Sequence, residues 1–245
     1  LKEDGGASVS FVLTGKQALI DQTAPTFYNY VNDSVGIPFN YRDMYGKISL
    51  LAGNGSKLNL FGFRYDDGVK YPITEFGWES AGGGFDFTLV PTNSNTIVGG
   101  TLTYSKYDSR IEESDRKPRE SGISGFYAGL NFTNFDRNNE FKYGLELTGL
   151  RTDFTFENFR GCQIEQFENT TEISVYLRWK RKIGPLVIEP GFRLQYYQSL
   201  NDISPEPRLG LKYNITDFLR FKAAGGLYSQ NLLSGEILQQ DRSCV

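Results

Sequence analysis

The chain has 245 residues, a net charge of −3, and 27 Gly, 19 Phe and 15 Tyr, but no His. The acidic balance and the scattered basic residues argue against a nucleic-acid partner. Without His, these residues contain no Ser-His-Asp or Asp-His site, and two Cys are too few for a structural zinc site, which needs about four ligands. We therefore expect no catalysis, no metal site and no cofactor.

No stretch of the sequence is apolar enough to form a membrane-spanning helix, which takes about 18 consecutive apolar residues. The longest apolar runs are short, as at Pro185-Leu186-Val187-Ile188. This excludes helical spans but not a transmembrane β-barrel, because half of each barrel strand faces a polar lumen.

Apolar residues alternate with polar ones along most of the chain, and we find no helical period. In chain order the alternating sets are Val9/Phe11/Leu13, Ile48/Leu50, Phe85/Phe87/Leu89, Phe126/Ala128/Leu130/Phe132, Phe141/Tyr143/Leu145/Leu147, Ile173/Val175/Leu177/Trp179, Leu186/Ile188/Phe192/Leu194 and Leu219/Phe221/Ala223. Strict alternation predicts half-buried strands. We expect about eleven strands of about ten residues or more, long enough to cross a bilayer.

Two kinds of connection separate these strands. Short turns are expected at residues 53–55, 91–95, 136–139, 182–185 and 214–217, where Asn, Gly, Asp or Pro supply tight-turn backbone angles. Longer polar loops are expected at about residues 16–40, 66–81, 107–121, 152–170 and 198–206. In this pattern we expect Asp66-Asp67-Gly68 to form a turn rather than to contact a cation, and Glu112-Glu113-Ser114-Asp115 to lie in a solvated loop.

Alternating short turns and long loops are typical of outer-membrane barrels, with the turns in the periplasm and the loops outside the cell. Aromatic residues on the apolar face also fall near predicted strand ends, where an interfacial girdle lies. They are Tyr104, Phe132, Phe141, Trp179, Tyr196 and Tyr213. The pattern predicts an all-β fold, an antiparallel transmembrane β-barrel, over a soluble β-sandwich or propeller.

One part of the sequence resembles the barrel of TonB-dependent outer-membrane receptors. The resemblance is carried by Ser204-Pro205-Glu206-Pro207-Arg208-Leu209-Gly210, a Thr216-Asp217 turn, Leu219-Arg220-Phe221, and Gly226 followed by Tyr228. Residues 43–49 and 53–59 also look like an early barrel hairpin of this family. Because family barrels have about 22 strands, the resemblance implies that residues 1–245 are a partial barrel domain, about half of one, without the plug domain.

The resemblance implies a place in the bacterial outer membrane and active import of a nutrient, of the siderophore, cobalamin, haem or glycan class. The implied partners are the lipid bilayer with its lipopolysaccharide, and TonB, which acts through a plug domain outside this chain. A surface lipoprotein or another outer-membrane protein is a further candidate partner. The alternative hypothesis is a barrel that acts as a scaffold or secretion component and holds partner proteins. A third is a soluble extracellular β-rich binding protein.

The candidate functional residues are the polar members of the alternating strands, which a barrel turns toward its lumen. They are Lys142, Glu146, Arg178, Lys180, Glu189, Arg193, Gln195, Arg220 and Lys222. In the family such residues line the wall and contact the plug; interior ion pairs without any substrate contact are the alternative. The hairpin count places Cys162 and Cys244 on the same, extracellular side, so the alternatives are a disulfide bracing those segments and two unrelated residues.

Overall fold

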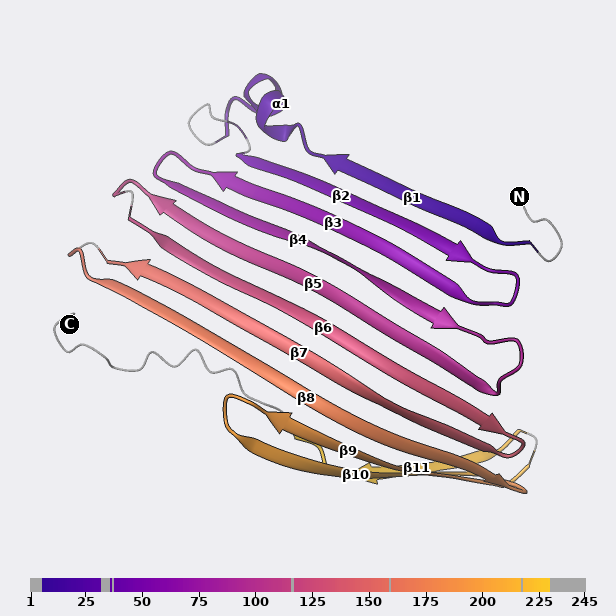
Figure 1. Cartoon of the computed structure of the whole chain (residues 1–245). Helices are drawn as coiled ribbons and strands as arrows, with labels where there is room; N and C mark the ends of the chain where they lie inside the picture. Colours follow the sequence, from indigo (N-terminus) through magenta and orange to yellow (C-terminus); the bar gives the residue numbers. More distant parts are fainter. Residues whose placement is uncertain are drawn as a thin grey trace.

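The computed structural model describes residues 6–31, 36, 38–115, 117–158, 160–216 and 218–229. They form one antiparallel sheet of eleven strands, each hydrogen-bonded to the next in chain order, with one short helix (Figure 1). The strands are β1 (Ser8–Gln17), β2 (Phe39–Leu51), β3 (Lys57–Lys70), β4 (Thr74–Leu89), β5 (Thr96–Glu113), β6 (Arg119–Asp136), β7 (Asn139–Glu157), β8 (Gln163–Ile183), β9 (Leu186–Tyr197), β10 (Asp202–Asn214) and β11 (Arg220–Gly226). The predicted all-β class and strand number are confirmed.

The register divides the side chains between two faces of the sheet. Along β7 and β8, Leu145 lies opposite Val175 and Leu147 opposite Ile173, so their apolar side chains share one face. We call this the apolar face and the opposite one the polar face. Among the described residues the buried apolar side chains are only Ala18, Ala24 and Tyr197, so the large apolar residues are not packed into a core. A sheet with this much exposed apolar surface is suited to lipid.

The apolar side chains form a continuous band across the strands, at the end of the sheet where the short turns lie. The band includes Phe11, Ile48, Leu60, Phe85, Leu102, Leu130, Leu145, Val175, Leu194 and Leu211. At the turn edge of the band, the rings of Phe132 and Tyr143 stack at 5.2 Å and those of Phe141 and Trp179 at 5.8 Å. Phe132, Phe141, Trp179 and Tyr213 of the expected girdle lie at this edge, whereas Tyr104 and Tyr196 lie at the opposite edge of the band.

The expected short turns are present. They occupy residues 52–56, 90–95, 137–138 and 184–185, with 215–216 and 218–219 between β10 and β11, all at one end of the strands (Figure 1). Gly55 (φ 86°) and Gly184 (φ 58°) adopt the left-handed conformation that favours glycine. In the tight turn between β6 and β7, Arg137 takes this conformation instead (φ 39°).

Most of the predicted long loops are wrong. Residues 66–70 continue β3, and residues 74–81 belong to β4, so Asp66-Asp67-Gly68 is strand and not a turn. Likewise Glu112 and Glu113 end β5 rather than lying in a loop. The hairpins extend beyond the apolar band because opposite charges face each other across strands, as in the pair between Arg110 Nε and Glu120 Oε1 at 3.4 Å.

The helix is a second departure from expectation. Residues 16–40, predicted as a loop, contain α1 (Ile20–Phe27), which has Pro25 in its interior and contacts β2. Ala24 of α1 is fully buried, and Gly36 (φ 82°) approaches it so closely that a Cβ at position 36 would lie 2.8 Å from the Ala24 Cβ. Among the described residues, no helix is long and apolar enough to cross a membrane.

A charge placed in the apolar band is expected to destabilise the folded protein in a bilayer. We expect Leu145→Arg to lower the free energy of unfolding in lipid vesicles by about 2–4 kcal/mol, the cost of a cationic side chain near the bilayer midplane. The matched control is Thr155→Arg, on the same strand and face, where Glu120 and Glu165 are the cross-strand neighbours. Urea titration of the full-length protein measures both, and equal destabilisation would contradict the position of the band.

The connection between β5 and β6 is expected to open in acid. Asp115 accepts hydrogen bonds from Arg119 Nη2 at 2.8 Å and from the Lys117 backbone N–H at 3.1 Å, which lower the pKa of its carboxyl. Because the folded pKa is depressed, this stabilisation is complete above the ordinary carboxyl pKa of about 3.9 and is lost as the pH falls through the folded value.

We therefore expect the Lys117 amide to exchange its hydrogen faster, relative to its intrinsic rate, at about pH 3 than at about pH 6. Asp115→Asn should remove this pH dependence and leave exchange fast at both values. An unchanged pH profile in that variant would refute the assignment.

Candidate functional site on the polar face

The candidate residues all lie on the polar face, on strands β7, β8, β9 and β11. Lys142 and Glu146 come from β7, Arg178 and Lys180 from β8, Glu189 and Arg193 from β9, and Arg220 and Lys222 from β11. Alternation alone places them there, since each lies between apolar-face residues such as Leu145 and Leu177. The structure brings most of them into two neighbouring hollows.

A hydrogen-bonded network crosses the middle of this face. Arg193 Nη1 and Glu146 Oε2 form an ion pair at 2.9 Å, although β8 lies between their strands. The Ser174 hydroxyl donates to Glu146 at 3.3 Å, and the Arg193 Nε–H donates to the side-chain oxygen of Gln195 at 3.2 Å. The Gln195 amide then donates to Glu172 at 2.8 Å. The network ties β7, β8 and β9 together beyond their backbone ladder.

A second set of ion pairs lies nearer the turns. Glu140 binds Lys180 Nζ at 3.0 Å and Arg178 Nη2 at 3.2 Å. Arg178 also binds Glu189 at 3.2 Å, so a single guanidinium links β7 to β9. Lys142 lies directly opposite another cation, Arg178, and within the described residues it makes no ion pair. The acids of this part of the face are therefore engaged, while Lys142 is free to meet a partner.

The first hollow has a volume of about 430 Å³ and lies between β7 and β11. Its charged lining consists of Lys142, Glu146, Arg178, Glu189, Arg193 and Arg208. Tyr176 and Tyr228 contribute rings. The Tyr176 ring is half-buried against Gly144, where a Cβ would lie 2.8 Å from its hydroxyl oxygen. Because residue 144 is a glycine, the Tyr176 ring can lie flat along the sheet.

The second hollow, of about 420 Å³, lies beside the first and closer to the turns. Lys180, Lys212 and Lys222 line it together with Glu189. Lys212 and Lys222 are directly opposite each other in the register, an arrangement that repels unless an anion or water lies between them. Arg220 lies one polar-face position before Lys222, at the start of β11, and lines neither hollow.

Sequence reasoning missed the carboxylate of Glu206. It is only 2% exposed, and it pairs with Arg208 and accepts hydrogen bonds from the Ser229 hydroxyl and backbone N–H at 2.6 and 2.8 Å. The flanking Pro205 and Pro207 drew attention to the strand start instead. The signal was present, because Ser204, Glu206 and Arg208 continue the polar alternation of β10.

The remaining predictions concern metals and the cysteines. Within the described part of the chain, no group of His, Cys, Asp or Glu is arranged to hold a metal ion. Cys162 lies in the connection between β7 and β8, and its proposed pairing falls on Cys244, which is outside the described residues. That disulfide stays a prediction.

Comparison with solved structures identifies the fold. The chain is similar to the ferric enterobactin receptor of Pseudomonas aeruginosa, with a TM-score of 0.61 and 11% identity over 91% of this chain and 39% of that one. It is also similar to the outer-membrane transporter YddB of Escherichia coli, with a TM-score of 0.50 and 10% identity over 85% of this chain and 36% of that one. The chain thus spans less than two fifths of either protein.

Two other matches are the β-domain of the Bordetella autotransporter BrkA and the translocator domain of the Neisseria meningitidis autotransporter NalP, each with a TM-score of 0.36, which is too low to support an argument. No family model matches the sequence, and no curated protein matches it. The fold is that of outer-membrane β-barrels, in agreement with the outer-membrane location expected from the sequence.

The ion pair between Glu146 and Arg193 is expected to stabilise the sheet only while both partners are present. Either Glu146→Ala or Arg193→Ala leaves a partly buried charge without its partner, whereas the double variant removes both. We expect a coupling energy of about 1–2 kcal/mol in a double-mutant cycle, measured by unfolding in vesicles. The cycle Lys106→Ala/Asp108→Ala, an exposed pair, is the control. Additive effects at positions 146 and 193 would contradict the network.

Proposed function

We propose that this chain is part of the barrel of an outer-membrane transporter that imports a nutrient with energy supplied through TonB. The observation that carries the proposal is the fold: nine tenths of the chain matches the structure of the ferric enterobactin receptor, and each strand of this sheet pairs with the next one in chain order. The residues that carry the family resemblance lie in two hairpins of this sheet: most belong to β10, β11 and the residues next to these strands, and the others, 43–49 and 53–59, belong to the hairpin of β2 and β3.

The polar face supports a role as the wall of a hydrated passage. Arg178, Arg193 and the glutamates that pair with them are held by ion pairs, which keep these side chains against the sheet instead of across the lumen. A wall of this kind stays hydrated and offers hydrogen bonds to whatever lies inside. The proposal assigns no catalysis to the chain and places TonB contact in a plug domain encoded elsewhere in the protein. A surface lipoprotein and lipopolysaccharide are the further proposed partners.

The test is nutrient uptake by a strain lacking the full-length protein. The panel consists of ferric siderophores, cobalamin, haem and glycans, each as the limiting nutrient, in the presence and absence of TonB. We expect the strain to lose growth on one nutrient class, and we expect loss of TonB to abolish the same uptake. Expression of the full-length protein should restore it.

Normal uptake of every nutrient, together with loss of a protein complex from the outer membrane, would favour the scaffold or secretion role instead. A second measurement is the mass of the intact protein extracted from outer membranes. A mature chain close to the 27.7 kDa of these residues would refute a transporter with a plug.

A further inference from the structure

Next to its apolar band, the apolar face carries two rows of charged residues. They lie toward the end of the strands where α1 lies. One row of the register runs from Arg64 through Ala81, Lys106 and Ser124 to Arg151, and its charged members are all cations. The next row outward holds the acids Asp66, Glu79, Asp108 and Asp153. We call these two rows the exterior belt. The cations are thus the charges nearest to the lipid-facing band.

Each cation of the belt is paired with the acid two residues later on its own strand. The distances are 3.1 Å for Arg64 and Asp66, 2.9 Å for Lys106 and Asp108, and 3.0 Å for Arg151 and Asp153. The same Arg/Lys-x-Asp pattern therefore recurs on β3, β5 and β7. Its side chains are largely exposed, so the pairs are open to solvent and to ligands at the membrane surface.

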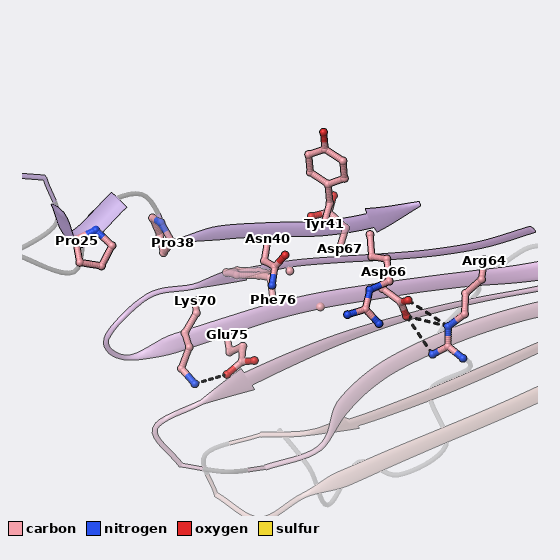
Figure 2. Close-up of a pocket in the computed structure, with 13 residues that line it drawn as sticks. Pro25, Pro38, Asn40, Tyr41, Arg64, Asp66, Asp67, Lys70, Glu75 and Phe76 are labelled. Carbon is pink, nitrogen blue, oxygen red and sulfur yellow. Dashed lines mark hydrogen bonds and ion pairs between the residues drawn. The ribbon is translucent and has the colours of Figure 1, made fainter. Parts of the chain in front are cut away.

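A hollow of about 790 Å³ lies at the end of the belt, between α1 and the outer parts of β2, β3 and β4. Figure 2 shows Pro25 of α1 and Pro38 on one side, with the Lys70–Glu75 and Arg64–Asp66 pairs along its margins. In the register, the row between these two pairs holds Gly68 opposite Gly77, with Asn40 of β2 on the other side of Gly68.

This glycine row gives the hollow a floor of bare backbone. A Cβ added at Gly77 would meet no atom within 4 Å, and one at Gly68 would only reach the Phe76 carbonyl oxygen at 3.5 Å. The space directly over these two glycines is therefore open. Its size is in the range of small-ligand sites, about 300–1,000 Å³.

One cation of the hollow has no acid of its own. Arg42 lies on β2 opposite Asp66, but Asp66 pairs with Arg64, and Glu75 pairs with Lys70. Within the described residues Arg42 makes no ion pair, and it is exposed. An arginine with five donors and no partner, at the edge of an open polar hollow, is suited to a phosphate group.

We propose that this hollow binds the phosphorylated sugar headgroup of a glycolipid from the outer leaflet, with Arg42 on the phosphate and the sugar over the Gly68–Gly77 floor. The position selects this ligand: the hollow shares the face of the apolar band and lies just beyond it, at headgroup level. The acyl chains then lie along the band near Leu60 and Ile48. The proposal depends on the fold and not on the transported nutrient.

The experiment uses the full-length protein in nanodiscs. It measures the binding of a fluorescent lipid A that carries both phosphates, and the displacement of this probe by competitors. We expect Arg42→Ala to weaken binding about tenfold, as expected for loss of a charge-assisted hydrogen bond, and Arg42→Lys to retain part of it. Gly77→Val should abolish binding by filling the floor. The control is Ala81→Val, on the same strand and face but outside the hollow, which should bind like the wild type.

Further arms separate the sources of phosphate. Lipid A lacking one phosphate should bind more weakly than the bisphosphorylated form, and neither phosphatidylglycerol nor inorganic phosphate should displace the probe at matched concentration. Displacement by either would overturn the glycolipid assignment. Wild-type affinity in both Arg42→Ala and Gly77→Val, with heat-modifiable gel migration showing that both are folded, would overturn the site itself.

Discussion

The backbone hydrogen-bond ladder between successive strands is the constraint on which the rest of this structure depends. In lipid, an N–H or C=O group finds no water, so every strand must pair with a neighbour along its whole spanning length. The side-chain period of a strand is two, so the ladder fixes the face of each residue. A slip of one residue between β7 and β8 would turn Val175 and Leu177 inward and Arg178 toward lipid, which makes the register energetically well defined.

The ion pairs of the polar face reinforce that ladder where it carries the most charge. Arg178 joins Glu140 on β7 to Glu189 on β9, and Arg193 reaches Glu146 across β8. Each link spans three strands, so it resists sliding of the middle strand as well as separation of the outer two. The lysines that remain, Lys142 in the first hollow and Lys212 and Lys222 in the second, leave the wall with unmatched positive charge. The paired arginines are thereby held in place, whereas these three lysines keep flexible side chains that can adapt to a partner.

Strand number, faces and short turns were predictable from the sequence because each follows from a local signal: the period of two, or a residue such as Gly55 or Gly184 at a tight turn. The prediction of long loops is wrong because these segments have the polar composition of loops while the period of two continues through them, as in Arg64, Asp66, Gly68 and Lys70 of β3. The α1 helix has too few residues for a helical period and contains Pro25. The two hollows could not be predicted, since they join strands that only the register brings together.

The width of the apolar band decides which parts of these long strands lie in the membrane. On β7 it runs from Phe141 to Gly149, about 26 Å along the strand at about 3.3 Å per residue, which a strand tilt of about 40° reduces to about 20 Å of depth. An outer-membrane barrel exposes an apolar height of about 25 Å, so this band, which includes its aromatic edge, accounts for most of the spanning segment. The residues that follow on β7, Arg151 and Asp153, point from the same face and would be costly in lipid. The outer parts of the hairpins must therefore stand in water, where cross-strand charges and not lipid hold them. For that reason polar segments that resembled loops in composition remain strands.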